Sequence, residues 1–345
     1  MERQLSYLIS QLSKNNSLRI SCFVWNYSKD AYYFDFFEEQ LSGDLMGASS
    51  NNSLLKKQKL LIKQVRKSNP AFIISFSNFT NFQAFIGGCF CNAKTYGGFR
   101  SSAAYMLDSL SLKKILSLIF PFRIISNSKV AIDELKQIWW LKHVRFKHFP
   151  NFIDLVQFLG SDPDSQKEFH SISVGSLLPG KRLNRLFDLI LEMKKYIPNI
   201  KHIHLGDGPL MNEYRKKIKV LELSEHISFL GKTKAVREHL SKSKVFVHFS
   251  DFEGTPNVVL EAMAVGLPVI STNCGDVATY LKDNENGFVI PRAEAYDPKL
   301  FLEKYHHLLG NESERRNKGQ NSLAIIENYN LERMAFTFLK LIGLN

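Results

Sequence analysis

Two glutamates, Glu253 and Glu261, lie on either side of a predicted junction between a loop and a helix. The junction belongs to the segment 244–270, in which residues 245–249 form a mostly apolar run typical of a strand buried in a parallel sheet. A polar loop follows at 250–255, then a helical segment and a second apolar run. The segment is therefore predicted to form one βαβ unit, with a carboxylate before and within its helix.

The start of this helix has the chemistry of an anion site. Thr255 is a suitable N-cap and Pro256 a suitable first helical residue, while Gly266 and Pro268 are typical of the end of a helix. Backbone N–H groups at a helix N-terminus favour phosphate, and ligands of open α/β sheets bind at this carboxyl edge. Gly254 has no side chain to keep a phosphate away. The sequence thus predicts a phosphate site at the start of the helix.

On spacing alone, the simpler interpretation is that Glu253 is a solvated loop acid and Glu261 an exposed helix residue. The residues that join them, Glu-Gly-Thr-Pro-Asn-Val-Val-Leu-Glu-Ala-Met-Ala, favour another. They resemble the E-x7-E signature of retaining, nucleotide-sugar-dependent glycosyltransferases of the GT-B fold, family 4. The resemblance implies that Glu253 lies by the donor sugar and that Glu261 binds the ribose hydroxyls.

A second glycine-containing turn, at 175–182, follows a predicted strand at 171–174 and precedes a predicted helix at 183–193. Such turns suit phosphate. The family has Gly-Arg here and a lysine five positions after the arginine, and both cations hold the donor diphosphate. Lys181 matches the lysine, Ser176 replaces the arginine, and Arg182 can supply the second charge. The resemblance thus makes Lys181 and Glu253 the candidate catalytic residues.

Other turns of the second half complete the implied donor site. The turn at 206–209 resembles the family's Gly-x-Gly-Pro turn, although an ordinary structural glycine turn explains it equally simply. The strand at 227–231 ends in the Phe-Leu-Gly that the family places against the nucleotide base. Besides Glu261 and Arg182, the expected donor-binding residues are Gly254, Thr255, Pro256, Asn257, Gly231, Lys232, Gly206 and Asp207.

The first half of the chain resembles the family's acceptor-side domain more weakly. Its opening is predicted as a helix at 2–13 followed by a strand at 18–25, whereas the family begins with a strand and a Gly-Gly-Ala loop. We therefore expect this domain to lack its first strand, either because translation starts upstream or because the protein is naturally truncated. Arg100 and Ser101 resemble an Arg-Ser pair on the acceptor side, which gives Arg100 a role in holding an anionic acceptor.

Charge is concentrated in this first half. Residues 1–150 contain 20 Lys and Arg against 9 Asp and Glu, a net charge of +11, whereas residues 151–345 contain 25 against 24, a net charge of +1. The segment 51–67 holds six basic residues and no acid, with leucines at helical spacing. It is predicted to be a cationic helix that is either simply solvated or lies on an anionic membrane surface. No nucleic-acid-binding motif accompanies the charge, so a nucleic-acid partner is not expected.

Four scattered cysteines indicate a reduced, cytoplasmic location rather than a disulfide framework. The mixed polar start of the chain does not resemble a cleavable signal, and no apolar run approaches the twenty residues of a membrane span. A peripheral position on the inner face of the cytoplasmic membrane is compatible with both observations. No Asp-x-Asp pair lies in the donor loops, so no metal or other cofactor is expected.

The resemblance implies an α/β protein of the GT-B fold, with two Rossmann-like parallel-sheet domains facing across a cleft. The expected divisions are an acceptor-side domain at 1–155, a linker at 156–168, a donor-binding domain at 169–328, and a helix at 329–345 that crosses back. The implied enzyme is a retaining hexosyltransferase that moves a sugar from a nucleoside diphosphate, UDP rather than GDP, to a lipid-linked or oligosaccharide acceptor in bacterial envelope polysaccharide or glycan synthesis. The alternative is an inactive GT-B-like subunit that binds a nucleotide sugar or acts as a scaffold.

Overall fold

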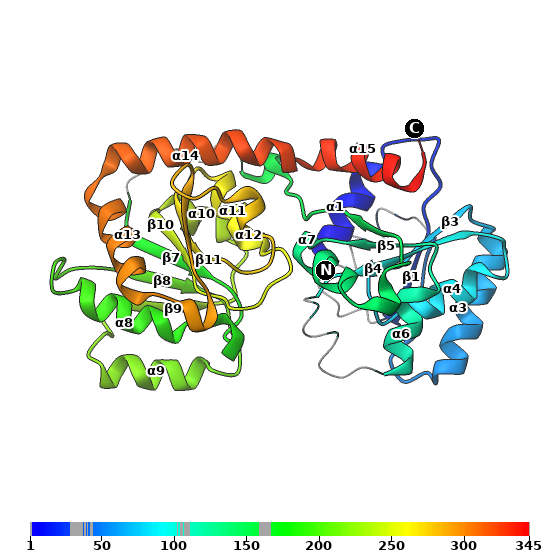
Figure 1. Ribbon diagram of the computed structural model, residues 1–345, viewed down its shortest axis with the longest axis horizontal. Coiled ribbons are helices and arrows are strands. Elements are labelled where there is room, and N and C mark those ends of the chain that lie inside the picture. Colours follow the sequence, from blue (N-terminus) through cyan, green and yellow to red (C-terminus); the bar gives the residue numbers. More distant parts are fainter. Residues whose placement is uncertain are drawn as a thin grey trace. The chain divides into compact units, whose positions relative to one another are not determined.

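The computed structural model describes residues 2–27, 44–101, 111–158 and 167–344, together with Phe37, Glu39, Leu41, Ala103 and Met106. The chain divides into two compact units, one formed by 1–151 and 331–345 and the other by 152–330 (Figure 1). Of the predicted linker at 156–168, the residues 159–166 lie outside the described part of the chain.

The second unit contains a six-stranded sheet in which all neighbouring strands are parallel. Its spatial order is β12 (Gly287–Ile290), β11 (Val269–Thr272), β10 (Ser243–His248), β7 (Phe169–Val174), β8 (His202–Leu205) and β9 (Ile227–Gly231). From β7 the chain proceeds outward to β9, then returns to β10 on the other side of β7. The strand order therefore reverses between β7 and β10, and such a switch point is where open α/β sheets bind ligands.

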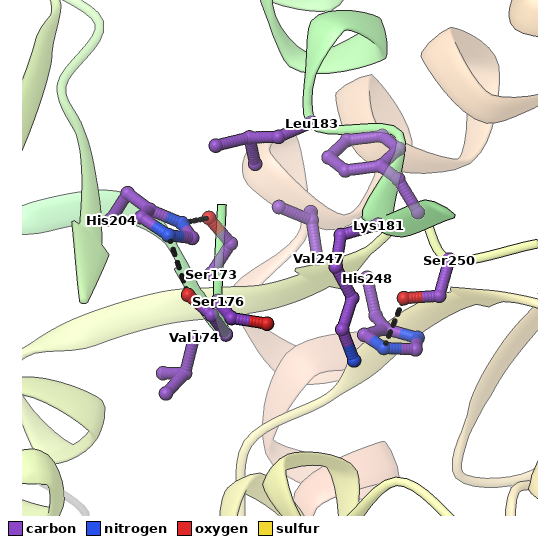
Figure 2. Close-up of a pocket in the computed structure, with 11 residues that line it drawn as sticks. Ser173, Val174, Ser176, Lys181, Leu183, His204, Val247, His248 and Ser250 are labelled. Atoms are coloured by element: carbon purple, nitrogen blue, oxygen red, sulfur yellow. Dashed lines mark hydrogen bonds between the residues drawn. The ribbon is translucent and has the colours of Figure 1, made fainter. Parts of the chain in front are cut away.

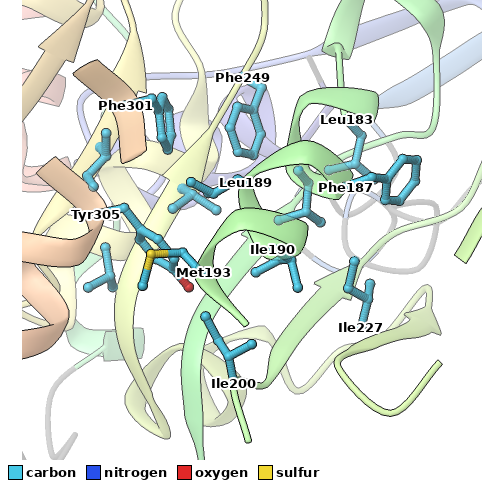
Figure 3. Packing of buried hydrophobic residues seen from close by; sticks show 14 of the residues in the cluster. Leu183, Phe187, Leu189, Ile190, Met193, Ile200, Ile227, Phe249, Phe301 and Tyr305 are labelled. Carbon is cyan, nitrogen blue, oxygen red and sulfur yellow. The ribbon is translucent and has the colours of Figure 1, made fainter. Parts of the chain in front are cut away.

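Helices cover both faces of this sheet, as its apolar strands require. One face packs against α8 (Asn184–Met193), α9 (Met211–Val220) and α13 (Pro298–Gly310), and the core beneath them includes Phe187, Tyr305 and the inward side chains of β10 (Figure 3). The other face packs against α10 (Val236–Ser241), α11 (Asn257–Ala264), α12 (Val277–Tyr280) and α14 (Glu312–Ile326). The two layers hold the strands rigidly and leave the loops at the carboxyl edge to form a site.

The predicted βαβ unit is present as β10, α11 and β11, and β10 pairs in parallel with β11. Gly266 ends the helix with a φ of +71°, in the left-handed region that favours glycine. The helix starts one residue later than predicted: Pro256 takes the cap position with a ψ of 105° and makes no side-chain cap hydrogen bond. Proline fixes φ but leaves ψ free, so Pro256 fits an extended cap as well as a first helical turn.

The first unit contains a four-stranded parallel sheet in the order β3 (Phe72–Ile74), β4 (Lys94–Phe99), β5 (Arg123–Ser126) and β6 (Phe146–His148). A separate parallel pair joins β1 (Cys22–Tyr27) to β2 (Leu45–Ser49). The helices with described bounds are α1 (Glu2–Leu12), α3 (Leu54–Ser68), α4 (Asn81–Gly88), α6 (Leu112–Ile119), α7 (Lys129–Lys136) and α15 (Leu331–Ile342).

Within the first unit, the C-terminal helix α15 packs onto the sheet. The Tyr96 hydroxyl donates to the carbonyl of Ile342 at 3.0 Å, and the rings of Phe149 and Phe338 lie 5.1 Å apart. Within the described residues the chain opens on α1, and β1 begins later than the predicted strand at 18–25, because the ladder with β2 starts only at Cys22.

The predicted cationic helix is α3, which is capped at Ser53 and buries Leu61 and Val65. Its lysines at 56, 59 and 63 are exposed, as are Leu54 and Leu55. Among the described residues, no helix combines the length and apolarity needed to cross a membrane.

Candidate functional site

Two loops meet at the switch point of the second unit. One follows β7 and includes the 3-10 turn Pro179–Lys181, and the other follows β10 and ends at α11. The amide of Asp251 donates to the carbonyl of Gly180 at 3.1 Å, which fixes one loop against the other. A cavity of ≈ 20 Å³ lies beside them, large enough for one water molecule, and Ser176, Lys181, His204, His248 and Ser250 are among the side chains that line it (Figure 2).

The central contact of the site is an ion pair between Lys181 Nζ and Glu253 Oε1. Ser250 Oγ donates to the same oxygen at 3.0 Å, and His248 Nε2 lies 3.6 Å from it. Burial raises the pKa of Glu253, but the hydrogen bond with His248 and the charge of Lys181 outweigh that effect, and its pKa is lowered to about 2. Glu253 is therefore a carboxylate at every physiological pH and not a general acid. The structure brings the two predicted catalytic residues together.

Asp251 forms a second buried charge centre in the same loop. Its carboxylate accepts from Arg182 Nε at 2.5 Å, from Arg185 Nη1 at 2.9 Å and from the amide of Ala293 at 3.1 Å. Burial would raise the pKa of Asp251, but these hydrogen bonds and the charge of Arg185 lower it. Arg292 donates to the backbone carbonyl of Asp251 at 2.6 Å. The aspartate is buried, so the cluster is a preformed element rather than a surface ion pair.

The two loops are balanced in charge, with Lys181 and Arg182 against Asp251 and Glu253, but Arg185 of α8 and Arg292 after β12 add two cations to the cluster. Lys181, Arg182, Arg185 and Arg292 contribute four cations, and only Asp251 and Glu253 oppose them within the contacts described above. The loop that holds both carboxylates leads into the N-terminus of α11, and the helix dipole adds partial positive charge there. A doubly charged anion such as a diphosphate would complete this arrangement.

Glu261 and its neighbours on α11 differ from the simpler expectation. Glu261 is only 4% exposed, so the interpretation of an exposed helix residue is wrong. It lies in the second turn of the helix, as predicted. Thr255 is also buried. Glutamate side chains are almost never fully buried unless they are paired, so the carboxylate of Glu261 is held within the fold. Its position in the second turn keeps it close in sequence to the start of α11.

The glycine turn after β8 has a structural function. A Cβ on Gly206 would lie 1.9 Å from the carbonyl oxygen of Gly175, and its φ of +134° also favours glycine. A Cβ on Gly208 would lie 2.7 Å from the backbone of Leu177. These glycines allow the backbone of the turn to pack closely against the backbone of the loop after β7. Asp207 is exposed, and its carboxylate accepts a hydrogen bond from the amide of Gly208. Gly231 and exposed Lys232 follow at the end of β9, on the same edge of the sheet.

A series of hydrogen bonds runs through the core of the second unit to Gly175, in the loop after β7. It passes from Tyr305 Oη to Ser171 Oγ at 2.6 Å, to His202 Nδ1 at 2.7 Å, from His202 Nε2 to Ser173 Oγ at 2.9 Å, and to His204 Nδ1 at 2.8 Å. His204 Nε2 then lies 3.0 Å from the carbonyl oxygen of Gly175. The β7–β8 register places Ser171 beside His202 and Ser173 beside His204, which builds this ladder directly.

One end of the chain determines the direction of every bond in it. A carbonyl can only accept, so His204 donates from Nε2 and its Nδ1 accepts from Ser173. Ser173 therefore accepts from His202 Nε2, and His202 Nδ1 accepts from Ser171, which accepts from Tyr305. Burial lowers the pKa of His202 well below its usual value and lowers that of His204 to about 4. Both rings are thus neutral near pH 7, and the chain fixes the carbonyl of Gly175.

The predicted acceptor-side residues lie at the carboxyl end of β4 in the first unit. Arg100 Nη1 donates to Asn151 Oδ1 at 3.0 Å, and its guanidinium lies 4.8 Å from the centre of the Phe76 ring. Burial lowers the pKa of Arg100 to about 10. No described carboxylate pairs with this cation, and no described group bonds the buried Ser101 Oγ. Both side chains can therefore form further hydrogen bonds at the carboxyl edge of the sheet, where ligands bind in open α/β folds.

Several residues of the site were not predicted from the sequence. Four of them contribute to the charged cluster: His248 at the end of β10, Arg185 in α8, Asp251 and Arg292. His202 and His204 belong to the hydrogen-bond chain behind it. Asp251 carried a usable signal, since it is an acid in the short loop that follows a buried strand. The arginines carried none, because their partners lie 41 to 66 residues away and depend on the packing of α8 and the 292–295 turn.

Comparisons with known proteins bear on the fold and the class of protein. Residues 161–324 match the family model described as glycosyl transferases group 1. The chain is 31% identical over 157 residues to the Vi polysaccharide biosynthesis protein VipC/TviE of Salmonella typhi, a match that covers 45% of this chain and 27% of that protein. The chain spans about half the length of three further curated relatives.

Other matches extend over most of the chain. An N-acetylgalactosaminyltransferase of Campylobacter jejuni, named for an undecaprenol diphosphate glycan, is 25% identical over 295 residues, with 84% of this chain and 79% of that protein covered. The crystal structure of Anabaena HepE with UDP-glucose superposes with a TM-score of 0.81 at 16% identity, covering 99% of this chain and 95% of that one. The fold is GT-B, and the findings together support a glycosyltransferase of that fold.

Proposed function

We propose that the protein is a retaining glycosyltransferase of family 4 that transfers a sugar from a nucleoside diphosphate to a lipid-linked or oligosaccharide acceptor. The observation that carries the proposal is the Lys181–Glu253 pair at the switch point, next to the N-terminus of α11. Retention of configuration rests on the resemblance of residues 253–264 to the E-x7-E signature.

The reaction breaks the bond between the anomeric carbon and the diphosphate oxygen, and a bond from that carbon to an acceptor hydroxyl oxygen replaces it, while the hydroxyl proton passes to the leaving diphosphate or to water. Negative charge then develops on the leaving diphosphate. Lys181, Arg182 and the first amides of α11 would stabilise it, as donors preorganised in a partly buried site do. Glu253, ionised at neutral pH, would position the donor sugar and stabilise positive charge at its anomeric carbon. Glu261 would bind the ribose.

The nucleotide is proposed to be UDP, the nucleotide part of the UDP-glucose in the HepE structure, and no metal is proposed to take part. The excess of positive charge from Lys181, Arg182, Arg185 and Arg292 can neutralise a diphosphate by itself. The acceptor is proposed to carry an anionic group that Arg100 holds. Polysaccharide and undecaprenol-linked glycan synthesis among the relatives supports a bacterial envelope glycan as the product.

A second candidate is an inactive subunit that binds a nucleotide sugar or acts as a scaffold. Ser176, in place of the family's arginine, favours it, since the side chain that should hold the diphosphate is neutral. The structure offers Arg182 nearby, but Asp251 already binds that guanidinium at 2.5 Å. Ionised Glu253 beside Lys181 favours the enzyme.

The test is thermal stabilisation of the purified chain by millimolar UDP, GDP, ADP and CMP, each with and without EDTA. A ligand at 100 times its dissociation constant adds about 2.7 kcal/mol, which is a melting shift of a few degrees. A shift with UDP that EDTA does not change supports the enzyme with a metal-free site. No shift with any nucleotide would contradict donor binding and favour the scaffold.

A further inference from the structure

A basic groove lies on the first unit, at the edge of the sheet opposite Arg100. It has a volume of ≈ 460 Å³, and its lining includes six basic side chains and no acid: Arg123, Lys136, Lys142, His143, Arg145 and Lys147. Arg123 begins β5, Arg145 directly precedes β6, and Lys136 ends α7, so the groove is at the amino ends of the strands. Arg100 and Asn151, by contrast, follow the carboxyl ends. The groove is therefore distinct from the proposed acceptor site.

The backbone forces two of these arginines together. The amide of Ile124 donates to the carbonyl of Arg145 at 3.0 Å, which aligns the starts of β5 and β6. The guanidinium carbons of Arg123 and Arg145 then lie 5.0 Å and 5.6 Å from the centre of the same ring, that of Phe122. Two like charges on neighbouring strands repel each other, and no carboxylate in the described part of the chain pairs with either.

Local structure accounts for part of the charge only. Arg123 Nη1 donates to the carbonyl of Leu341 at 3.5 Å, and Lys136 suits the C-terminus of α7. Lys142, Arg145 and Lys147 are exposed and form no ion pair with a described carboxylate. On a surface whose charges serve only solvation, lysines would be spread out rather than gathered in one groove. A concave surface that gathers them around two arginines concentrates positive potential where an anion would lie.

We propose that this groove binds a phosphate-bearing anion, independently of the nucleotide-sugar site. Guanidinium pairs and lysines of this kind match phosphate oxygens in charge and geometry. The phosphate can belong to a lipid headgroup or to a soluble compound. Trp139, which is 77% exposed between Lys136 and Lys142 in the sequence, provides an apolar side chain of the kind that enters a membrane interface. The inference holds whether or not the protein transfers a sugar.

The experiment compares the wild-type chain with a groove variant that has lost three exposed lysines, Lys136→Gln, Lys142→Gln and Lys147→Gln. A control variant loses the same charge from exposed positions of the second unit, by Lys216→Gln, Lys219→Gln and Lys299→Gln. Two probes are used: inorganic pyrophosphate, by titration calorimetry with UDP present to occupy the loops of the second unit, and vesicles of 70% phosphatidylcholine and 30% phosphatidylglycerol, by co-sedimentation. Circular dichroism melting shows that each variant is folded.

The groove variant is expected to bind at least tenfold more weakly than wild type, while the control variant binds as wild type does. Binding of vesicles alone would identify the lipid headgroup as the source, and binding of pyrophosphate as well would identify a soluble phosphate. Equal losses in both variants would mean that general charge attracts the probes, and would overturn the proposal. So would the failure of wild type to bind either probe.

Discussion

The loops at the carboxyl edge of the second unit and the groove at the amino edge of the first unit are both rich in cations, but they hold them differently. In the second unit Lys181 is paired with Glu253, and both Arg182 and Arg185 with Asp251, in contacts whose carboxylates are 16% and 1% exposed. In the first unit two groove cations, Arg123 and Arg145, lie against the ring of Phe122, and no described carboxylate pairs with either. Charges paired within the protein fix the geometry of a site before its ligand binds. Unpaired cations repel one another until a bound anion neutralises them.

The largest expected effect comes from removing the central carboxylate. Glu253→Ala is expected to lower turnover by about 100-fold or more, because the charge that stabilises the transition state is lost, while KM for the donor changes little. Steady-state kinetics with the identified donor measures both. Glu225→Ala, which removes an exposed glutamate of the same unit, is the control and should leave both parameters unchanged. Unchanged turnover in Glu253→Ala would refute its role.

The next prediction concerns the serine–histidine hydrogen bonds between β7 and β8, which lie behind the loop after β7. Ser173→Ala leaves His202 Nε2 without an acceptor and His204 Nδ1 without a donor, both buried. The free energy of unfolding should fall by about 3 kcal/mol. Ser228→Ala removes an exposed hydroxyl from β9 of the same sheet and should change it by less than about 0.5 kcal/mol. Denaturant titration measures both, and equal effects would show that the chain contributes nothing specific.

Acid should weaken the same region. The pKa of His204 is about 4 in the folded protein and 6.5 is its ordinary value, so between these values the unfolded state binds more protons. The stability that the neutral ring contributes is therefore fully present above pH 6.5 and is lost as the pH falls to 4, by at most about 3 kcal/mol. Melting temperatures between pH 7.5 and 4.5 test this sign. A stability that rose on acidification would contradict the neutral chain.

The smallest expected effects are changes in the free energy of unfolding, and they have opposite signs in the two regions. Lys181→Gln leaves the carboxylate of Glu253 without its cation and should destabilise the fold by about 1 kcal/mol. Lys147→Gln removes one of several repelling charges from the groove and should stabilise the fold by up to about 0.5 kcal/mol. Urea unfolding of the two variants side by side is sufficient. A loss of stability in Lys147→Gln would mean that the groove cations are compensated after all.

Local patterns in the sequence were sufficient for most of the second unit. The strand β9 begins and ends where the sequence predicts, at 227 and 231, and the helix α11 ends at the glycine that its sequence indicates. Its start was misplaced by one residue, because proline is compatible with both a cap and a first turn. The GT-B fold followed from motifs of the second half, and the comparisons with solved structures confirm it.

The site could be predicted only where its residues lie close in sequence. Glu253 and Glu261 are eight positions apart on one loop and helix, so their motif identified them. The partners of Asp251 come from α8 and from a turn after β12, and the serine–histidine chain depends on the register between β7 and β8. Neither is encoded in a local pattern. The groove was visible only as a net charge of the first half, without a place on the fold.

The most direct test of the account is the affinity of the wild-type chain for UDP, compared with Lys181→Gln and with Lys147→Gln by titration calorimetry. If the paired loops form the diphosphate site, UDP binds the wild type, Lys181→Gln weakens it at least tenfold, and Lys147→Gln leaves it unchanged. Equal affinities in all three proteins, or no binding of UDP to the wild type, would contradict a UDP-sugar site built on Lys181 and Glu253.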